Sequence, residues 1–180
     1  MKPTPKVPIV LTAALFVLAG VAEMATGRSR SSQDDDAQRV GRVALVRVDE
    51  ALAHGDTAAA LRAWQRAYEA ARMNRGWRGL VEAADAGVRI EAEAPGTAAP
   101  RTRSMYLAAL DRARAERSVE GTVRVAEGFS RLGDREVTDR VLRLAASLAV
   151  HSGDTAAPTR VESVRGRLLK RASSLTPAAV

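Results

Sequence analysis

The two histidines are the residues of this chain whose type and spacing could carry chemistry. His54 stands in the string AHGDTAA and His151 in the string HSGDTAA, so each lies just ahead of a Gly-Asp pair. A histidine next to a carboxylate can act as a general acid–base pair or bind a metal ion. A duplicated site of this kind would indicate an enzyme.

A third Gly-Asp pair argues against that interpretation. Gly133-Asp134 has no histidine beside it, and all three pairs fall where one helical apolar pattern stops and the next starts. Glycine supplies the left-handed backbone that ends a helix, and aspartate accepts hydrogen bonds from the free amides that begin the next one. We therefore predict that the Gly-Asp pairs are turns and that both histidines lie in the last turns of helices.

Few other residues could support catalysis. The chain has no cysteine, no H-E-x-x-H motif and no phosphate-binding glycine loop, so thiolate chemistry and disulfides are excluded. The acidic run at 34–36 lies in a Ser-rich stretch, where we expect it to be solvated. Glu82 and Asp85 share a helix face, but Arg78 and Arg89 stand at helical spacing to balance them. We therefore expect no catalytic residue, no cofactor and no metal site.

The composition favours an all-α fold. Hydrophobic residues make up 46% of the chain, but many are alanine, and aromatic residues make up only 3%. Alanine has the highest helix propensity, whereas sandwich and barrel cores depend on β-branched and aromatic side chains. The net charge of +7 is carried mostly by arginine, which could favour an anionic partner.

The first 27 residues resemble a membrane-targeting segment. Lys2 and Lys6 precede an uncharged run over 7–22, and lysines stay on the cytoplasmic side of a membrane. We expect a signal anchor over 1–27, with a signal peptide cleaved after residue 22 as the alternative. Either would place the remaining chain on the extracytoplasmic side (periplasmic or extracellular), and cleavage of residues 1–22 would make it a secreted protein.

The rest of the chain divides into three parts. Residues 28–38 are polar and Ser-rich and are expected to be a flexible linker, 39–151 a helical repeat domain, and 152–180 an amphipathic capping helix with a tail. A Pro/Gly-rich stretch at 93–102 is expected to be a loop within the repeat domain. The apolar periodicity predicts helices over about 40–52, 57–73, 77–92, 104–117, 119–132, 135–148 and 158–175.

Two segments are similar to tetratricopeptide (TPR) repeats. GDTAAALRAWQRA resembles the second half of a TPR unit, and WRGLVEAA resembles the first half of the next. The string GFSRLGDREVTDRVLRLA aligns again, with Thr138 at a position usually held by alanine. The residues that carry the resemblance are Gly55, Asp56, Ala60, Trp64, Ala67, Trp77, Leu80, Phe129, Gly133, Asp134, Leu142 and Ala145. The resemblance implies about three helical hairpins, the middle one interrupted, although a generic helical bundle would share these small and bulky positions.

A TPR-like stack implies a non-catalytic scaffold that binds a protein or peptide on its concave face. In such a stack the first helix of each hairpin lines that face. Charged residues of both signs are expected there, which suits an extended peptide. The expected partner-binding residues are Arg42, Asp49, Arg75, Arg78, Glu82, Asp85, Glu127 and Arg131.

The C-terminal helix supports a second hypothesis. Arg160, Arg167, Lys170 and Arg171 crowd one side of it. A basic amphipathic helix can bind lipid headgroups or another polyanion, which would make the protein a peripheral binder of anionic surfaces. We do not expect nucleic acid as a ligand if the domain lies outside the cytoplasm. The other function of such a helix is to cover the open apolar end of a helical stack.

Overall fold

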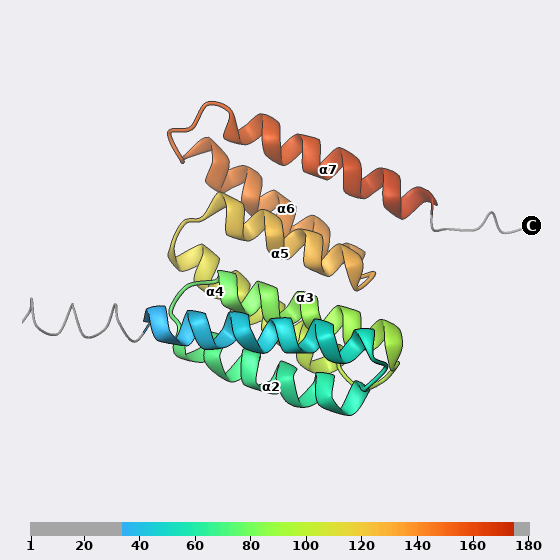
Figure 1. Cartoon of the computed structure of the whole chain (residues 1–180). Coiled ribbons are helices and arrows are strands. Elements are labelled where there is room, and N and C mark those ends of the chain that lie inside the picture. Colours follow the sequence, from blue (N-terminus) through green and yellow to red (C-terminus); the bar gives the residue numbers. More distant parts are fainter. Residues whose placement is uncertain (1–33, 175–180) are drawn as a thin grey trace, which may run out of the picture.

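The computed structural model describes residues 34–174, and within this range the chain folds into seven helices and no strand (Figure 1). The predicted all-α class is therefore confirmed. The first of these helices is described over residues 34–53 and is called helix 34–53 below. The others are α2 (Thr57–Met73), α3 (Arg78–Glu93), α4 (Ala99–Ala115), α5 (Val119–Arg131), α6 (Arg135–Val150) and α7 (Ala157–Ser174).

The helices form a stack of hairpins with two layers. From α2 to α7, each helix packs on the next one along the chain. In addition α3 packs on α5 and α5 on α7, whereas α2, α4 and α6 do not pack on one another. Asp49 of helix 34–53 is paired with Arg89 of α3, which extends the same layer by one helix. Helix 34–53, α3, α5 and α7 are therefore neighbours in one layer, here called the odd layer.

The predicted Gly-Asp turns are confirmed. Gly55 and Gly133 have φ values of +70° and +76°, the left-handed conformation that ends a helix. The carboxylates of Asp56 and Asp134 accept hydrogen bonds from amides three residues later, at 2.8 and 3.2 Å. Each pair thus ends one helix and begins the next, and Gly133-Asp134 does so with no histidine beside it.

Helix 34–53 corrects one expected boundary. We expected residues 28–38 to be a linker, but residues 34–38 are helical. The acidic residues at 34–36 are among the first described residues of this helix. Asn74 donates a hydrogen bond to the carbonyl oxygen of Asp34 at 3.3 Å, which ties the first described turn of the helix to the end of α2.

The expected loop over 93–102 is too long, because α4 begins at Ala99. Ser104, at the expected start of this helix, lies inside it and donates to the carbonyl oxygen of Pro100. The cap is supplied by Glu91 at the end of α3, whose carboxylate accepts from the backbone amides of Ala98 and Ala99 at 2.7 and 2.9 Å. The hydrogen bond from the backbone amide of Gly96 is the largest cause of a lowered pKa of Glu91, and those from Ala98 and Ala99 lower the pKa further.

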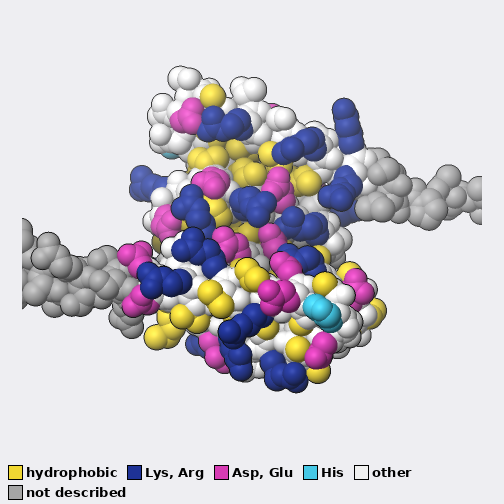
Figure 2. All heavy atoms as spheres, in the orientation of Figure 1, with side chains coloured by type: hydrophobic (Ala, Val, Ile, Leu, Met, Phe, Trp, Pro, Cys, Tyr) yellow, Lys and Arg dark blue, Asp and Glu magenta, His cyan; other side chains and the backbone are white. Residues whose placement is uncertain are grey.

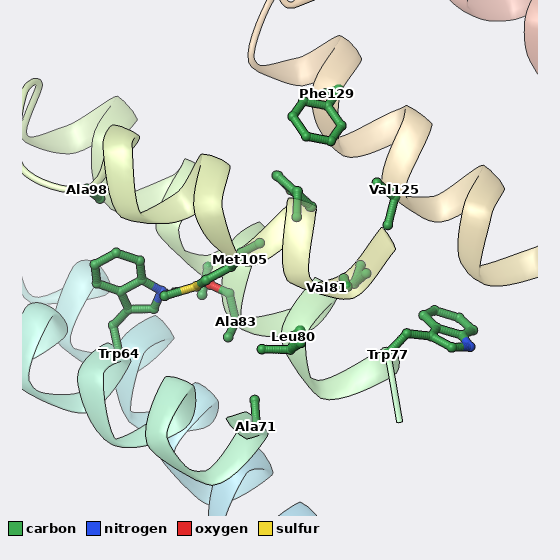
Figure 3. Packing of buried hydrophobic residues seen from close by; sticks show 14 of the residues in the cluster. Trp64, Ala71, Trp77, Leu80, Val81, Ala83, Ala98, Met105, Val125 and Phe129 are labelled. Atoms are coloured by element: carbon green, nitrogen blue, oxygen red, sulfur yellow. Dashed lines mark hydrogen bonds between the residues drawn. The ribbon is translucent and has the colours of Figure 1, made fainter. Parts of the chain in front are cut away.

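Three aromatic side chains pack against glycines of neighbouring helices. Trp64 lies against Gly87, Trp77 against Gly121 and Tyr106 against Gly128. A Cβ atom at any of these glycines would come within 3.0 Å of the aromatic ring. All three rings are buried, and Figure 3 shows Trp64 and Trp77 within the same apolar cluster. The indole nitrogen of Trp64 donates to the carbonyl oxygen of Ala83 at 2.7 Å, so its burial leaves no unpaired donor.

No helix among residues 34–174 combines the length and the apolar character needed to span a bilayer. The segment 7–22, for which we expect a membrane role, lies outside the described residues.

We predict that Gly128→Ala lowers the free energy of unfolding by about 1–3 kcal/mol, because the added methyl group overlaps the fixed ring of Tyr106. The matched control is Gly166→Ala in α7, where an added Cβ meets nothing within 4 Å. That change should raise the free energy of unfolding by up to about 1 kcal/mol, because alanine is the better helix former. Urea unfolding followed by circular dichroism measures both. Equal stability of Gly128→Ala and the parent chain would show that the ring can move away from α5.

Candidate functional site

The charged residues of the odd layer are largely paired with one another. Figure 2 shows Arg and acidic side chains interspersed over the middle of the molecule. The pairs join successive helices of the layer, so they connect one hairpin to the next. They are Asp49–Arg89 at 2.8 Å, Arg78–Glu120 at 2.8 Å, Asp85–Arg124 at 3.1 Å, Asp85–Arg131, and Glu127–Arg167 at 3.7 Å.

These partners differ from the ones expected from helical spacing. We expected Arg78 and Arg89 to balance Glu82 and Asp85 on the same helix. Instead, Arg78 is paired with a residue of α5, and Arg89 with a residue of helix 34–53. The stack brings together residues that are about one hairpin apart in the sequence. Their ion pairs form in place of the ones expected within α3.

Asp85 lies at the centre of the most enclosed part of this network. Its side chain is 18% exposed and contacts Arg124 and Arg131, and it accepts a hydrogen bond of 2.5 Å from the hydroxyl of Tyr106. The ring of Tyr106 is fully buried. Burial and the hydrogen bond to Asp85 both raise the pKa of this phenol well above its ordinary value. The network joins α3, α4 and α5, so we assign it a structural role.

Five of the eight residues expected to bind a partner are thus engaged in ion pairs between helices: Asp49, Arg78, Asp85, Glu127 and Arg131. Such pairs are worth little when exposed, so a ligand could still exchange with the outer ones. Arg75 is exposed in the turn between α2 and α3. The remaining two, Arg42 and Glu82, lie together with Arg78 at a cavity.

This cavity is a groove of about 160 Å³ between helix 34–53, the end of α2 and the start of α3. Its apolar lining consists of small residues with Leu45 and Trp77 as larger members, and its polar lining carries two arginines and two glutamates. The lining residues are Ala37, Gln38, Gly41, Arg42, Leu45, Ala67, Ala70, Ala71, Asn74, Gly76, Trp77, Arg78, Gly79, Glu82 and Glu116.

The turn between α2 and α3, which forms one wall of this groove, is held in place by a side chain of α4. Arg112 of α4 donates to the carbonyl oxygens of Ala71 and Gly76 at 2.9 and 3.1 Å, so it caps the C-terminal end of α2. The side chain of Asn74 accepts from the amide of Gly76 at 2.7 Å. Sequence reasoning missed Arg112 and Asn74. Asparagine after a helix is a recognisable turn signal, but nothing near Arg112 in the sequence indicates its partners.

The groove is balanced in charge. Arg42 and Arg78 offset Glu82 and Glu116 among its lining residues. The guanidinium of Arg78 lies 4.8 Å from the centre of the Trp77 ring, and this cation–π contact helps to hold it at the edge of the cavity. The floor of the groove can accept a small apolar group of a ligand. The charged residues at its edge can bind both hydrogen-bond donors and acceptors of that ligand.

The two histidines have equivalent local contacts. The Nδ1 atom of His54 lies 2.7 Å from the carbonyl oxygen of Glu50, and that of His151 lies 2.8 Å from the carbonyl oxygen of Ser147. Each side chain is exposed and binds the last turn of its own helix, in agreement with the turn interpretation. Within residues 34–174, no group of three histidine or acidic side chains is placed to hold a metal ion.

The basic side of α7 is partly neutralised. Arg160 is paired with Asp154, and Arg167 lies 3.7 Å from Glu127 of α5. The apolar side of α7 is buried against α6 and α5 through Ala157, Val161 and other residues. This helix therefore covers the end of the stack.

Comparison of the chain with known protein families, with curated proteins and with solved structures gives no match.

We predict that stability falls as the pH rises above about 10 and that Tyr106 is one cause. The raised pKa keeps the phenol protonated in the folded chain, while the unfolded chain ionises from its ordinary pKa of 10.0, so this contribution is complete below pH 10 and lost above it. Tyr106→Phe should cost about 1 kcal/mol at pH 8, through the lost hydrogen bond to Asp85. The difference from the parent chain should shrink at pH 11. Urea titrations at both pH values test this, with Tyr68→Phe as the control, and a difference that stays constant would contradict it.

Proposed function

We propose that this protein is a non-catalytic, TPR-like scaffold that binds a segment of a partner protein in the groove beside helix 34–53. The observation that supports this most directly is the meeting of Arg42, Arg78 and Glu82 at one cavity. These residues come from two helices of the odd layer. The end of α2 completes the groove.

The lining of the groove favours a peptide over a polyanion. Its floor is built from alanine and glycine, so it fits a small apolar side chain. Its arginines and glutamates offer both donors and acceptors, which the backbone and side chains of a peptide can satisfy. A site for a polyanion would carry an excess of positive charge, which this groove lacks.

The proposed setting is a membrane surface. The uncharged segment at 7–22 would anchor the chain, or be cleaved from it, and the helical domain would lie on the extracytoplasmic side. Few residues separate that segment from helix 34–53. In the anchored form, the groove would lie near the membrane.

Site-specific photo-crosslinking in the full-length chain tests the proposed site. A photoreactive amino acid in place of Arg42 should form an adduct with a partner in native membranes. The same amino acid in place of Arg143, an exposed residue of α6, should not form that adduct. Adducts of equal yield at both positions, or at Arg143 alone, would place the partner elsewhere.

We predict that Arg78→Ala weakens binding of the captured partner about 5- to 150-fold, equivalent to about 1–3 kcal/mol. Arg89→Ala is the matched control: both arginines lie on α3 and form one exposed ion pair within the odd layer, but only Arg78 lines the groove. The control should change the affinity less than about twofold.

Salt dependence separates this proposal from the binding of an anionic surface. Binding in a charge-balanced groove should largely survive a rise in salt concentration, whereas binding through the arginines of α7 should fall steeply. If Arg167→Ala and Lys170→Ala abolish binding and Arg78→Ala does not, the second mode is the correct one.

A further inference from the structure

The two ends of the stack differ in their exposed surfaces. At the C-terminal end α7 exposes mainly polar side chains, with Leu169 as its one large exposed hydrophobic residue among those described. At the other end, helix 34–53 exposes Val40, Val43 and Val46 at 57%, 49% and 56%. Solenoid proteins generally need a polar outer face at both ends, so this valine face is an open end.

The exposed residues of helix 34–53 follow a heptad pattern. Arg39, Val43, Val46 and Glu50 are spaced by four, three and four residues, and all four are exposed. This is the alternating spacing of the two seam positions in a coiled coil, so the four side chains lie along one line on the helix. Here the line has valines at its centre and opposite charges at its two ends.

We propose that this face is a homodimer contact, in which helix 34–53 packs antiparallel against the same helix of a second copy of this chain. In an antiparallel pair the two kinds of seam position face each other, so Val43 lies opposite Val46 of the other copy. The same register places Arg39 opposite Glu50 of the other copy. The two-fold symmetry repeats both contacts, giving two valine pairs and two ion pairs, and closes the assembly at two chains.

The charges select this arrangement. A parallel pair would place Arg39 opposite Arg39 and Glu50 opposite Glu50, and like charges at such positions are unfavourable. In the single chain, Arg39 has only a weak contact with Asp36, at 3.7 Å with both side chains more than 70% exposed. Glu50 forms no ion pair with any residue between 34 and 174 that the structure places. Both end charges are therefore available to a second copy.

The neighbouring surface of α2 limits the width of the apolar face. Arg62 and Arg66 of α2 lie at a shallow depression together with Arg47 and Glu50, so this side of α2 is polar. The apolar surface is thus limited to a single helix, which fits one helix of a second copy. Because the contact is short, it should bury less than the surface area of about 1,200 Å² that is typical of stable complexes. We therefore expect a weak dimer.

Cysteine crosslinking in the full-length chain tests the proposal without background, because the natural chain has no cysteine. Val43→Cys and Val46→Cys chains, one of them carrying a size tag, are mixed in equal amounts and oxidised, so that cysteines directly opposite each other are joined by a disulfide. The antiparallel register predicts that the mixed product exceeds either homodimer about tenfold, because only the mixed pair faces across the seam. Val150→Cys, at the most exposed large hydrophobic residue described in the chain, measures random collision.

Charge variants decide whether the ion pairs set the contact. Arg39→Glu or Glu50→Arg alone should lower the yield of the mixed product about tenfold, because each creates two like-charge contacts in the dimer. The two changes combined in one chain restore opposite charges and should restore the yield. The proposal is overturned if homodimers predominate, if the yield equals that of Val150→Cys, or if the double variant fails to recover. Circular dichroism of each variant confirms that the helical fold is intact.

Discussion

The packing of buried aromatic rings against glycines sets the spacing of the helices. Trp64, Trp77 and Tyr106 each lie against a glycine of a neighbouring helix, where any side chain would overlap the ring. In an alanine-rich core few other side chains are large enough to fix how closely two helices approach. These contacts join α2 to α3, the start of α3 to α5, and α4 to α5, so they determine the positions of the odd-layer helices. The ion pairs between those helices depend on that spacing.

The high content of alanine and arginine in this chain has a structural explanation. Alanine allows close helix approach, and arginine reaches from one hairpin to the next with a long, flexible stem and several donors. Most of the described arginines of the odd layer therefore contact carboxylates rather than forming a continuous basic surface. Charge pairing of this kind leaves only limited places where a ligand could bind, and both places proposed above involve helix 34–53.

The helices and their turns could be predicted from the sequence because their signals are local. The Gly-Asp turns and the apolar stripes depend on residues within one or two helical turns of each other. The side-chain partners could not be predicted, because Asp49 and Arg89, or Arg78 and Glu120, are 40 and 42 residues apart, about one hairpin unit. The start of α4 at Ala99 could not be predicted for a similar reason. Its cap comes from Glu91 of the preceding helix, and no residue pattern near Ala99 indicates that contact.

The two surfaces of helix 34–53 are distinct. Gly41 and Leu45 face the groove, whereas Val43 and Val46 are exposed on the outside of the stack. Successive residues of a helix are rotated by about 100°, so these two sets lie on well-separated faces. A peptide in the floor of the groove and a second copy at the valine face would therefore occupy different faces of the helix, with Arg42 at the boundary between them. A dimer of this form would present two grooves related by a two-fold axis, and a partner with two binding segments would gain affinity from occupying both. Helix 34–53 would then connect ligand binding with self-association, although the rest of the odd layer serves mainly to hold the stack together.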